Sequence, residues 1–207
     1  MLFHRSCMVV LLSFAVAAAS AQDSKDAEPP MAPEGWKYVA SKDESCKFLV
    51  PNDIKRSSSR TQTSTRGGLK SAIASHVYTL KDDTVLKVGI IRQSGAALKG
   101  VKIKDVYDGF PETDKDEGGK PEEFKEFTSG KLKGKEYANT TKDGLFQRNV
   151  LFVLNGGRVY NLTVESKDKE KTTDAEADTF LKGLYLIPAK KIEPKKTESK
   201  PAPDKTP

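Results

Sequence analysis

The stretch NVLFVLNGGRVYNLTVES, residues 149–166, carries the strongest structural signal in this chain of 207 residues. Two apolar runs flank Asn155-Gly156-Gly157, and Asn-Gly pairs tolerate the positive φ angles that tight hairpin turns require. We therefore expect an antiparallel hairpin here. The preceding segment FTSGKLKGKEYANTT, residues 127–141, predicts one further strand that ends at the turn Lys142-Asp143-Gly144. This half of the chain thus predicts a meander of three strands.

A second set of strands is indicated nearer the N-terminus. CKFLVP, residues 46–51, predicts a short strand that ends at a proline. Residues 69–81 and 85–93 alternate between two faces on either side of the turn at residues 81–84, so they predict an antiparallel hairpin. The segment SSSRTQTSTR, residues 57–66, has no apolar face and predicts either a loop or a solvated edge strand.

Two segments switch from the period of a strand to that of a helix. Thr173, followed three residues later by Glu176, predicts a capping box at the start of the second helix. The expected fold class is α+β, an antiparallel β-sheet with two or more amphipathic helices packed on it in an α/β sandwich. The apolar residues that repeat at i, i+3, i+4 and i+7 are Ile103, Val106, Tyr107 and Phe110, then Ala177, Phe180, Leu181 and Leu184.

The first residues have the organisation of a signal peptide. A basic start at His4 and Arg5 precedes an apolar run from Met8 to Ala19, and Ala19-Ser20-Ala21 fits a signal-peptidase site. We expect residues 1–21 to be removed and the protein to be exported, to a periplasm or to the extracellular space. The apolar run is shorter than the roughly 20 residues of a membrane span, so we expect no transmembrane segment in the mature chain.

Composition divides the remainder into three parts. Residues 22–35 are polar and contain prolines, which predicts a linker. Residues 36–187 are long enough for a single α+β domain. Residues 188–207 are rich in lysine and proline and predict a disordered tail.

The charge balance is only mildly basic. The formal charge of +6 falls to about +5 when Arg5 is removed, and charged residues make up 31% of the chain. Nucleic-acid binding calls for clustered cations and stacking aromatics, so we expect no nucleic-acid partner. A loose basic run, Arg56, Arg60, Arg66 and Lys70, is a candidate contact for an anionic surface, and a solvated loop is the alternative.

The titratable residues give little support for catalysis. Cleavage would leave His76 as the sole histidine and Cys46 as the sole cysteine, and no GxSxG elbow is present. We expect Cys46 to be a buried packing residue, with an intermolecular disulfide as the alternative. One histidine and one cysteine cannot supply the four nitrogen and sulfur ligands of a usual zinc site. The loop that starts at Asp114 has Lys125 at the position where a calcium site needs a bidentate glutamate. We therefore predict no catalytic, metal or cofactor residues.

The order of these elements, with CKFLVP near the start, GRVYNLTV in the last hairpin and a final helix around TFLKGL, resembles the PsbP-like superfamily. This superfamily includes photosystem II extrinsic proteins and DcrB-like bacterial envelope proteins. The resemblance covers about residues 36–186 and implies an α/β sandwich that acts as a binding or assembly factor. It implies no catalytic set.

Three functions remain open from the sequence. The leading hypothesis is an exported, non-enzymatic binding or assembly domain whose partner is an envelope or extracellular protein or an anionic surface. The alternatives are a secreted hydrolase that uses His76, Tyr78 or acidic residues in a cleft, and a purely structural surface protein. The chain has few histidines and cysteines, which favours the non-enzymatic binding or assembly domain.

Overall fold

The computed structural model describes residues 28–43, 45–66, 69–95, 100–154 and 157–188. The expected signal peptide, residues 22–27 of the expected linker and residues 189–207 of the expected tail lie outside these ranges, as do Asn155 and Gly156 of the hairpin turn. The boundaries of those segments therefore stay predictions.

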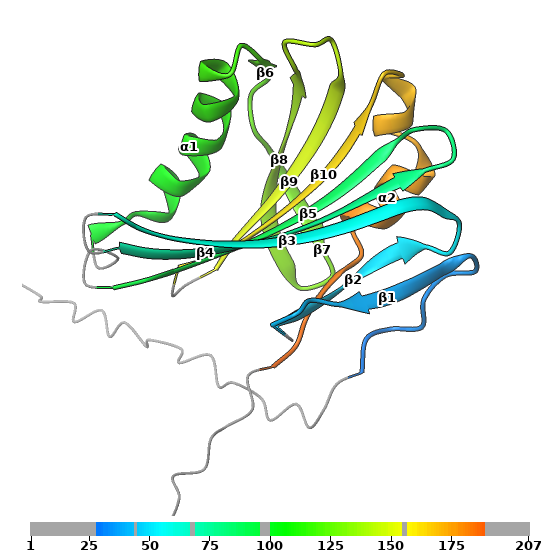
Figure 1. Cartoon of the computed structure of the whole chain (residues 1–207), viewed down its shortest axis with the longest axis horizontal. Coiled ribbons are helices and arrows are strands. Elements are labelled where there is room, and N and C mark those ends of the chain that lie inside the picture. The colour runs from blue at the N-terminus through cyan, green and yellow to red at the C-terminus, as the bar shows by residue number, and fades with distance from the viewer. Residues whose placement is uncertain (1–27, 44, 67–68, 96–99, 155–156, 189–207) are drawn as a thin grey trace, which may run out of the picture.

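Two antiparallel sheets make up most of the described structure (Figure 1). The smaller sheet has the order β1-β2-β11, from β1 (Trp36–Ala40), β2 (Cys46–Pro51) and β11 (Leu184–Leu186). The larger sheet has the order β3-β4-β5-β10-β9-β8-β6, and β7 also pairs with β8. Its strands are β3 (Ile54–Arg66), β4 (Leu69–Leu80), β5 (Val85–Ser94), β6 (Lys120–Pro121), β7 (Lys125–Ser129), β8 (Leu132–Thr140), β9 (Phe146–Leu154) and β10 (Arg158–Ser166).

The strand pairing follows most of the sequence-based expectations. The β4–β5 and β9–β10 hairpins are confirmed, and the polar segment 57–66 is part of the edge strand β3. The prediction of one strand over residues 127–141 is wrong. Gly130, at φ 57°, turns the chain there, so that β7 and β8 form a hairpin of their own.

Helices α1 (Ile103–Asp116) and α2 (Ala175–Leu181) accompany the sheets in the described residues, with a short 3₁₀ turn at Glu170–Thr172. The predicted capping box is wrong. The side chain of Asp174 caps α2 by accepting a hydrogen bond of 2.8 Å from the Ala177 amide, whereas the Thr173 hydroxyl donates to the Glu170 carbonyl. The structure is mainly antiparallel sheet with two short helices, which confirms the α+β class.

The main core lies between the larger sheet and the layer formed by the smaller sheet and α2. Phe48, Phe152, Tyr160 and Phe180 are among its largest fully buried side chains. Cys46 belongs to the same cluster and has no exposed surface, so the packing role expected for it is confirmed. Burial raises the pKa of its thiol to about 11.

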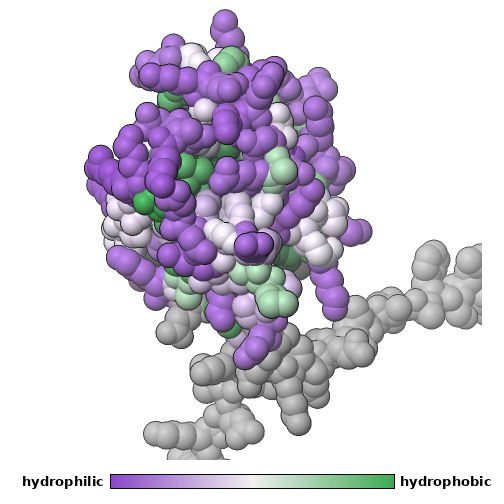
Figure 2. Space-filling model, turned by 90° about the vertical axis from the view of Figure 1, so that its right-hand side faces the viewer, coloured by the Kyte–Doolittle hydropathy of each residue, from purple (hydrophilic) through white to green (hydrophobic). Residues whose placement is uncertain are grey.

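The outer surface is mostly hydrophilic on the face drawn in Figure 2, where apolar residues show only in small areas. Among the described residues, the large apolar side chains with high exposure are Met31, Val101 and Ile103. Ile103 is the first residue of α1, and Val101 lies two positions before it.

Candidate functional site

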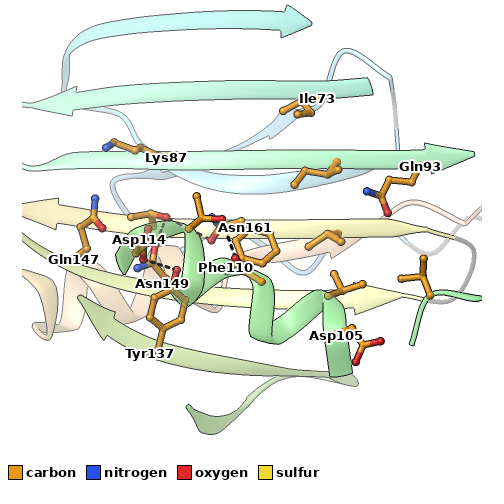
Figure 3. A pocket seen from close by; sticks show the side chains of 17 residues that line it. Ile73, Lys87, Gln93, Asp105, Phe110, Asp114, Tyr137, Gln147, Asn149 and Asn161 are labelled. Carbon is orange, nitrogen blue, oxygen red and sulfur yellow. Dashed lines mark hydrogen bonds between the residues drawn. The ribbon is translucent and has the colours of Figure 1, made fainter. Parts of the chain in front are cut away.

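A cleft lies between α1 and the face of the larger sheet that is turned away from the main core (Figure 3). Its volume is about 680 Å³, which is within the range of pockets that take small molecules. Helix α1 forms one wall, and strands β4, β5, β8, β9 and β10 form the floor. The site therefore joins segments that are far apart in the sequence.

Strand register gives the floor an apolar end. Ile73 on β4 pairs with Ile91 on β5, which in turn pairs with Val159 on β10, so the three side chains lie in one row across the sheet. Phe110 and Val106 of α1 line the same cavity. This end offers an apolar surface to a ligand.

The other end of the floor is polar, because the row of residues there is Lys87, Thr163, Asn149 and Tyr137. Asn149 and Thr163 are nearly buried, with 4% and 5% of their surfaces exposed. The Thr163 hydroxyl donates to Asn149 Oδ1 at 2.7 Å, but Asn149 Nδ2 is buried with no hydrogen-bond partner among the described residues. A buried donor left without a partner costs free energy.

A chain of side-chain hydrogen bonds borders this polar end. Asn139 donates to Gln147 at 3.0 Å, and Gln147 donates to Glu165 at 2.5 Å. Lys87 Nζ lies 2.7 Å from the same Glu165 oxygen, as an ion pair with 38% and 12% of the two side chains exposed. The positive charge of Lys87 is therefore already balanced by a neighbouring carboxylate.

Helix α1 is held to the sheet by two tyrosines. Tyr137 Oη donates to Asp114 Oδ2 at 2.9 Å, and Tyr107 Oη accepts a hydrogen bond of 3.4 Å from the Val153 amide. Tyr107 and Tyr137 also pack with Leu151 in a second, smaller core. Burial raises the pKa of Asp114, and burial together with the Asp114 charge raises the pKa of Tyr137.

The basic residues predicted from the sequence do not gather at this cleft. Arg56 and Arg60 are exposed on edge strand β3. Lys70 on β4 is exposed and pairs with Thr65, whose position in β3 puts it on the opposite face from Arg56 and Arg60. Arg66 pairs with Leu69, and its side chain lies outside the described part. The structure therefore separates Lys70 from the two described arginines.

His76 is a core residue of β4. Only 4% of its surface is exposed, its ring centroid lies 5.3 Å from that of Phe48, and Nδ1 is 2.9 Å from the Ser59 hydroxyl. Burial, with Lys42 nearby, lowers the pKa of His76. His76 does not line the cleft.

Two further findings concern metal binding and membrane spanning in the described ranges. Within them, no group of three or more His, Cys, Asp or Glu side chains could hold a metal ion. In the same ranges, no helix is both long enough and apolar enough to cross a membrane. Asp114, which opened the calcium-like sequence, instead accepts the hydrogen bond from Tyr137.

The cleft residues were missed by the sequence analysis, although one signal points to them. Asn161 and Thr163 alternate with Tyr160, Leu162 and Val164, so one face of β10 is apolar and the other carries small polar groups. Strand alternation of this kind is ordinarily assigned to a solvated face. Here α1 covers that face, which converts it into a lined cavity.

Comparisons with known proteins give a fold likeness only. No protein-family model matches the chain, and no curated protein matches its sequence. The structure is similar to the solution structure of cyanobacterial PsbP from Synechocystis sp. PCC 6803, with TM-score 0.46 and 12% identity over 78% of this chain and 98% of that one. It is also similar to the crystal structure of LpqN, involved in cell envelope biogenesis of Mycobacterium tuberculosis, with TM-score 0.42 and 15% identity over 74% and 91%.

The similarity to PsbP agrees with the resemblance to the PsbP-like superfamily given by the sequence. At these identities the likeness concerns the fold alone. It assigns no partner, ligand or location to this chain.

Proposed function

We propose that the protein is an exported, non-catalytic binding domain that takes an uncharged amphiphilic small molecule into the cleft beneath α1. The observation that carries the proposal is the cavity of about 680 Å³, with an apolar row at one end and, at the other, the Asn149 amide nitrogen, which has no hydrogen-bond partner among the described residues. Export is supported by the signal-like residues 1–21.

The apolar end suits the body of the ligand. Ile73, Ile91 and Val159 form the floor, and Phe110 and Val106 form the wall above them. An alkyl chain or ring removed from water there gains about 25 cal/mol for each Å² of apolar surface buried. Burial of apolar surface therefore supplies affinity for the ligand but does not select one particular apolar group.

The polar end suits a hydrogen-bonding head group. Asn149 Nδ2 requires an acceptor such as a carbonyl or hydroxyl oxygen. Rotating the amide by half a turn exchanges its oxygen and nitrogen, yet one of the two atoms still lacks a partner. A hydroxyl group, which both donates and accepts, satisfies either arrangement.

The charges around the polar end favour a neutral head group. Lys87 is paired with Glu165 at 2.7 Å, so its charge is compensated, while Asp114 adds a carboxylate to the lining. An anionic head group would meet this carboxylate, and burying an unpaired charge of either sign is costly.

The same contacts argue against catalysis. Tyr137 is committed to Asp114, Lys87 is committed to Glu165, and the sole histidine beyond residue 21 lies in the core on the opposite face. General acid–base catalysis needs a titratable group within reach of the substrate and with a pKa near the working pH. The raised pKa of Tyr137 moves that group away from this requirement.

A decyl series tests the proposal directly. Residues 22–207, labelled with ¹⁵N, are titrated below micelle-forming concentrations with 1-decanol, decanoate or decyltrimethylammonium, and the side-chain amide of Asn149 is followed by NMR. We expect saturable binding of decanol, with both charged analogues weaker by about tenfold or more. Absence of decanol binding, or equal binding of all three, would overturn the proposal.

Two variants locate the binding. A Cβ at Gly89 would make only ordinary contacts, 3.7 Å from Asn161, so Gly89→Leu projects a side chain from the cleft floor. Gly89→Leu is expected to block decanol, and Asn149→Leu to weaken it about tenfold. Ser58→Leu on exposed β3 is the control and should leave affinity unchanged. Loss of binding in the control, or none in the cleft variants, would place the ligand elsewhere.

A further inference from the structure

A second hollow lies on the opposite face of the larger sheet, beyond the end of the main core. Its volume is about 600 Å³, and its lining comes from β3, β4, β5 and β10. The lining is dominated by cations and hydroxyl groups. The residues used below are Thr63, Thr65, Lys70, Arg92, Ser94 and Arg158.

Strand pairing brings these side chains together. Ala72 on β4 pairs with Arg92 on β5, and Arg92 pairs with Arg158 on β10. In the next row Thr65 pairs with Lys70, and Lys70 pairs with Ser94. Directly paired residues share a face, so the three cations project from one surface. The small side chain of Ala72 leaves space between them.

Arg92 and Arg158 are like charges placed directly opposite each other. The Gln93 amide donates to the Gly157 carbonyl at 2.7 Å in the neighbouring pair, which makes Arg92–Arg158 a non-hydrogen-bonded pair. Side chains approach each other most closely in such pairs, and like charges there destabilise the sheet. The arrangement therefore carries a cost that a bound anion would offset.

One carboxylate offsets part of this charge. Asp43 Oδ2 lies 2.5 Å from an Arg92 terminal nitrogen, and the hydroxyls of Ser41 and Ser45 donate to Asp43 Oδ1. Arg92 Nε is buried and has no hydrogen-bond partner among the described residues. Lys70 and Arg158 are both exposed, and neither has an ion pair within the described part of the chain. The ten described lining residues include no acid, so the hollow keeps an excess of positive charge.

We infer that this hollow is a binding site for a phosphate group, held by Lys70, Arg92 and Arg158 and by the hydroxyls of Thr63, Thr65 and Ser94. A guanidinium group can donate two parallel hydrogen bonds to two oxygens of one phosphate, and a lysine ammonium adds a compact positive charge. Among the described lining residues Ala72 is the single aliphatic one, which fits a charged ligand and not an apolar one. The side chains that hold the phosphate lie on the other face of the sheet from the cleft beneath α1, and Gln93 borders both cavities.

The experiment compares two double variants that remove the same charge. Lys70→Gln with Arg158→Gln removes two cations from the hollow, whereas Arg56→Gln with Arg60→Gln removes two from the other face of β3. All four side chains are exposed, so both proteins are expected to fold. If the double variant of the hollow does not fold, Lys70→Gln alone replaces it, and its phosphate affinity is compared with that of the same control.

Each protein is titrated with inorganic phosphate at constant ionic strength, set with chloride, and amide shifts of Thr63, Thr65 and Ser94 are followed by NMR. We expect saturable binding to the wild type, a loss of affinity of about tenfold or more in the hollow variant, and no change in the control. Equal weakening in both variants would show general charge attraction and overturn the site. Absence of saturable binding to phosphate and to phospholipid alike would also overturn it.

A second arm distinguishes the two sources of phosphate. Co-sedimentation is measured with vesicles of phosphatidylglycerol and phosphatidylcholine, and with phosphatidylcholine alone. Retention on the anionic vesicles that is lost in the hollow variant and kept in the control supports a lipid headgroup as the ligand. Binding of inorganic phosphate without retention on vesicles supports a soluble phosphate compound. Decanol binding in the hollow variant reports separately on the cleft.

Discussion

Tyr137 Oη donates a hydrogen bond of 2.9 Å to Asp114 Oδ2, and this contact joins β8 to the last turn of α1. Both residues line the cleft, so the bond helps to set the distance between the helical wall and the floor. Near it, Lys135 Nζ lies 5.3 Å from the centroid of the Tyr107 ring and 5.6 Å from that of Phe124. The helix is thus anchored on its β8–β9 side, while the cleft extends toward β4.

The first prediction concerns this anchor. Tyr137→Phe removes the donor and leaves Asp114 partly buried without it, which should lower the free energy of unfolding by about 1 to 3 kcal/mol. Urea denaturation measures the change. Asp114→Asn keeps an oxygen that accepts from Tyr137, so it should cost less. Equal stability of Tyr137→Phe and the wild type would contradict the anchoring role.

The second prediction concerns pH. Burial, with Glu117 nearby, raises the folded-state pKa of Asp114 above its ordinary value of 3.8. The stabilisation linked to its protonated form is therefore complete below that value and is lost as pH rises through the raised pKa. Relative to Asp114→Asn, the wild type should lose free energy of unfolding as pH rises above about 4. Urea titrations of both proteins check the sign, and a wild-type free energy of unfolding that rises with pH relative to that of Asp114→Asn would contradict it.

The third prediction concerns Cys46, the sole cysteine of residues 22–207. A pKa raised from 9.0 to about 11 lowers the thiolate fraction about a hundredfold, and the side chain has no exposed surface. Iodoacetamide at about pH 8 should leave the native protein unlabelled over a time in which the urea-unfolded chain reacts completely. Mass spectrometry measures the adduct. Rapid labelling without urea would show that β2 is open to solvent.

The fourth prediction concerns the docking of α2. Arg148 on β9 donates to Glu136 at 2.8 Å and to Asp178 of α2 at 2.6 Å, with 17% of its side chain exposed. Arg148→Gln leaves the partly buried Glu136 without its cation and Asp178 with Lys182 alone, and should cost about 2 to 4 kcal/mol. Lys182→Gln breaks the exposed Asp178 pair and should cost less than about 1 kcal/mol. Thermal or urea unfolding compares them, and equal losses would contradict the ranking.

The sequence predicts the parts of this fold whose signals are local. The β9–β10 hairpin follows from alternation around Asn-Gly, and α1 follows from the spacing of Ile103, Val106, Tyr107 and Phe110. The strand β11 is different, because its three residues pair with β2 across most of the chain. Such a short strand depends on tertiary packing, which local spacing does not reveal.

The candidate sites depend on contacts that no local pattern contains. Asn149 and Thr163 become a cavity floor only because α1 covers their face of the sheet. Arg92 and Arg158 are 66 positions apart and meet through the register of β5 with β10. Of the three residues of the predicted basic run whose side chains the structure describes, Lys70 lines the second hollow, because strand alternation turns Arg56 and Arg60 to the other face.

The last prediction tests the packing of the sheet with a matched pair of glycine variants. A Cβ at Gly134 of β8 would overlap the carbonyl oxygen of Leu151 and lie 2.8 Å from a ring carbon of Phe152, so the backbone of β9 or the Phe152 ring would have to shift. Gly134→Ala should therefore destabilise the protein by about 1 to 3 kcal/mol. A Cβ at Gly109, inside α1, meets nothing within 4 Å, so Gly109→Ala should stabilise by about 0.5 to 1 kcal/mol through the helix preference of alanine. Opposite signs in urea denaturation are required; a tolerated Gly134→Ala would mean that β8 and β9 do not pack at this register.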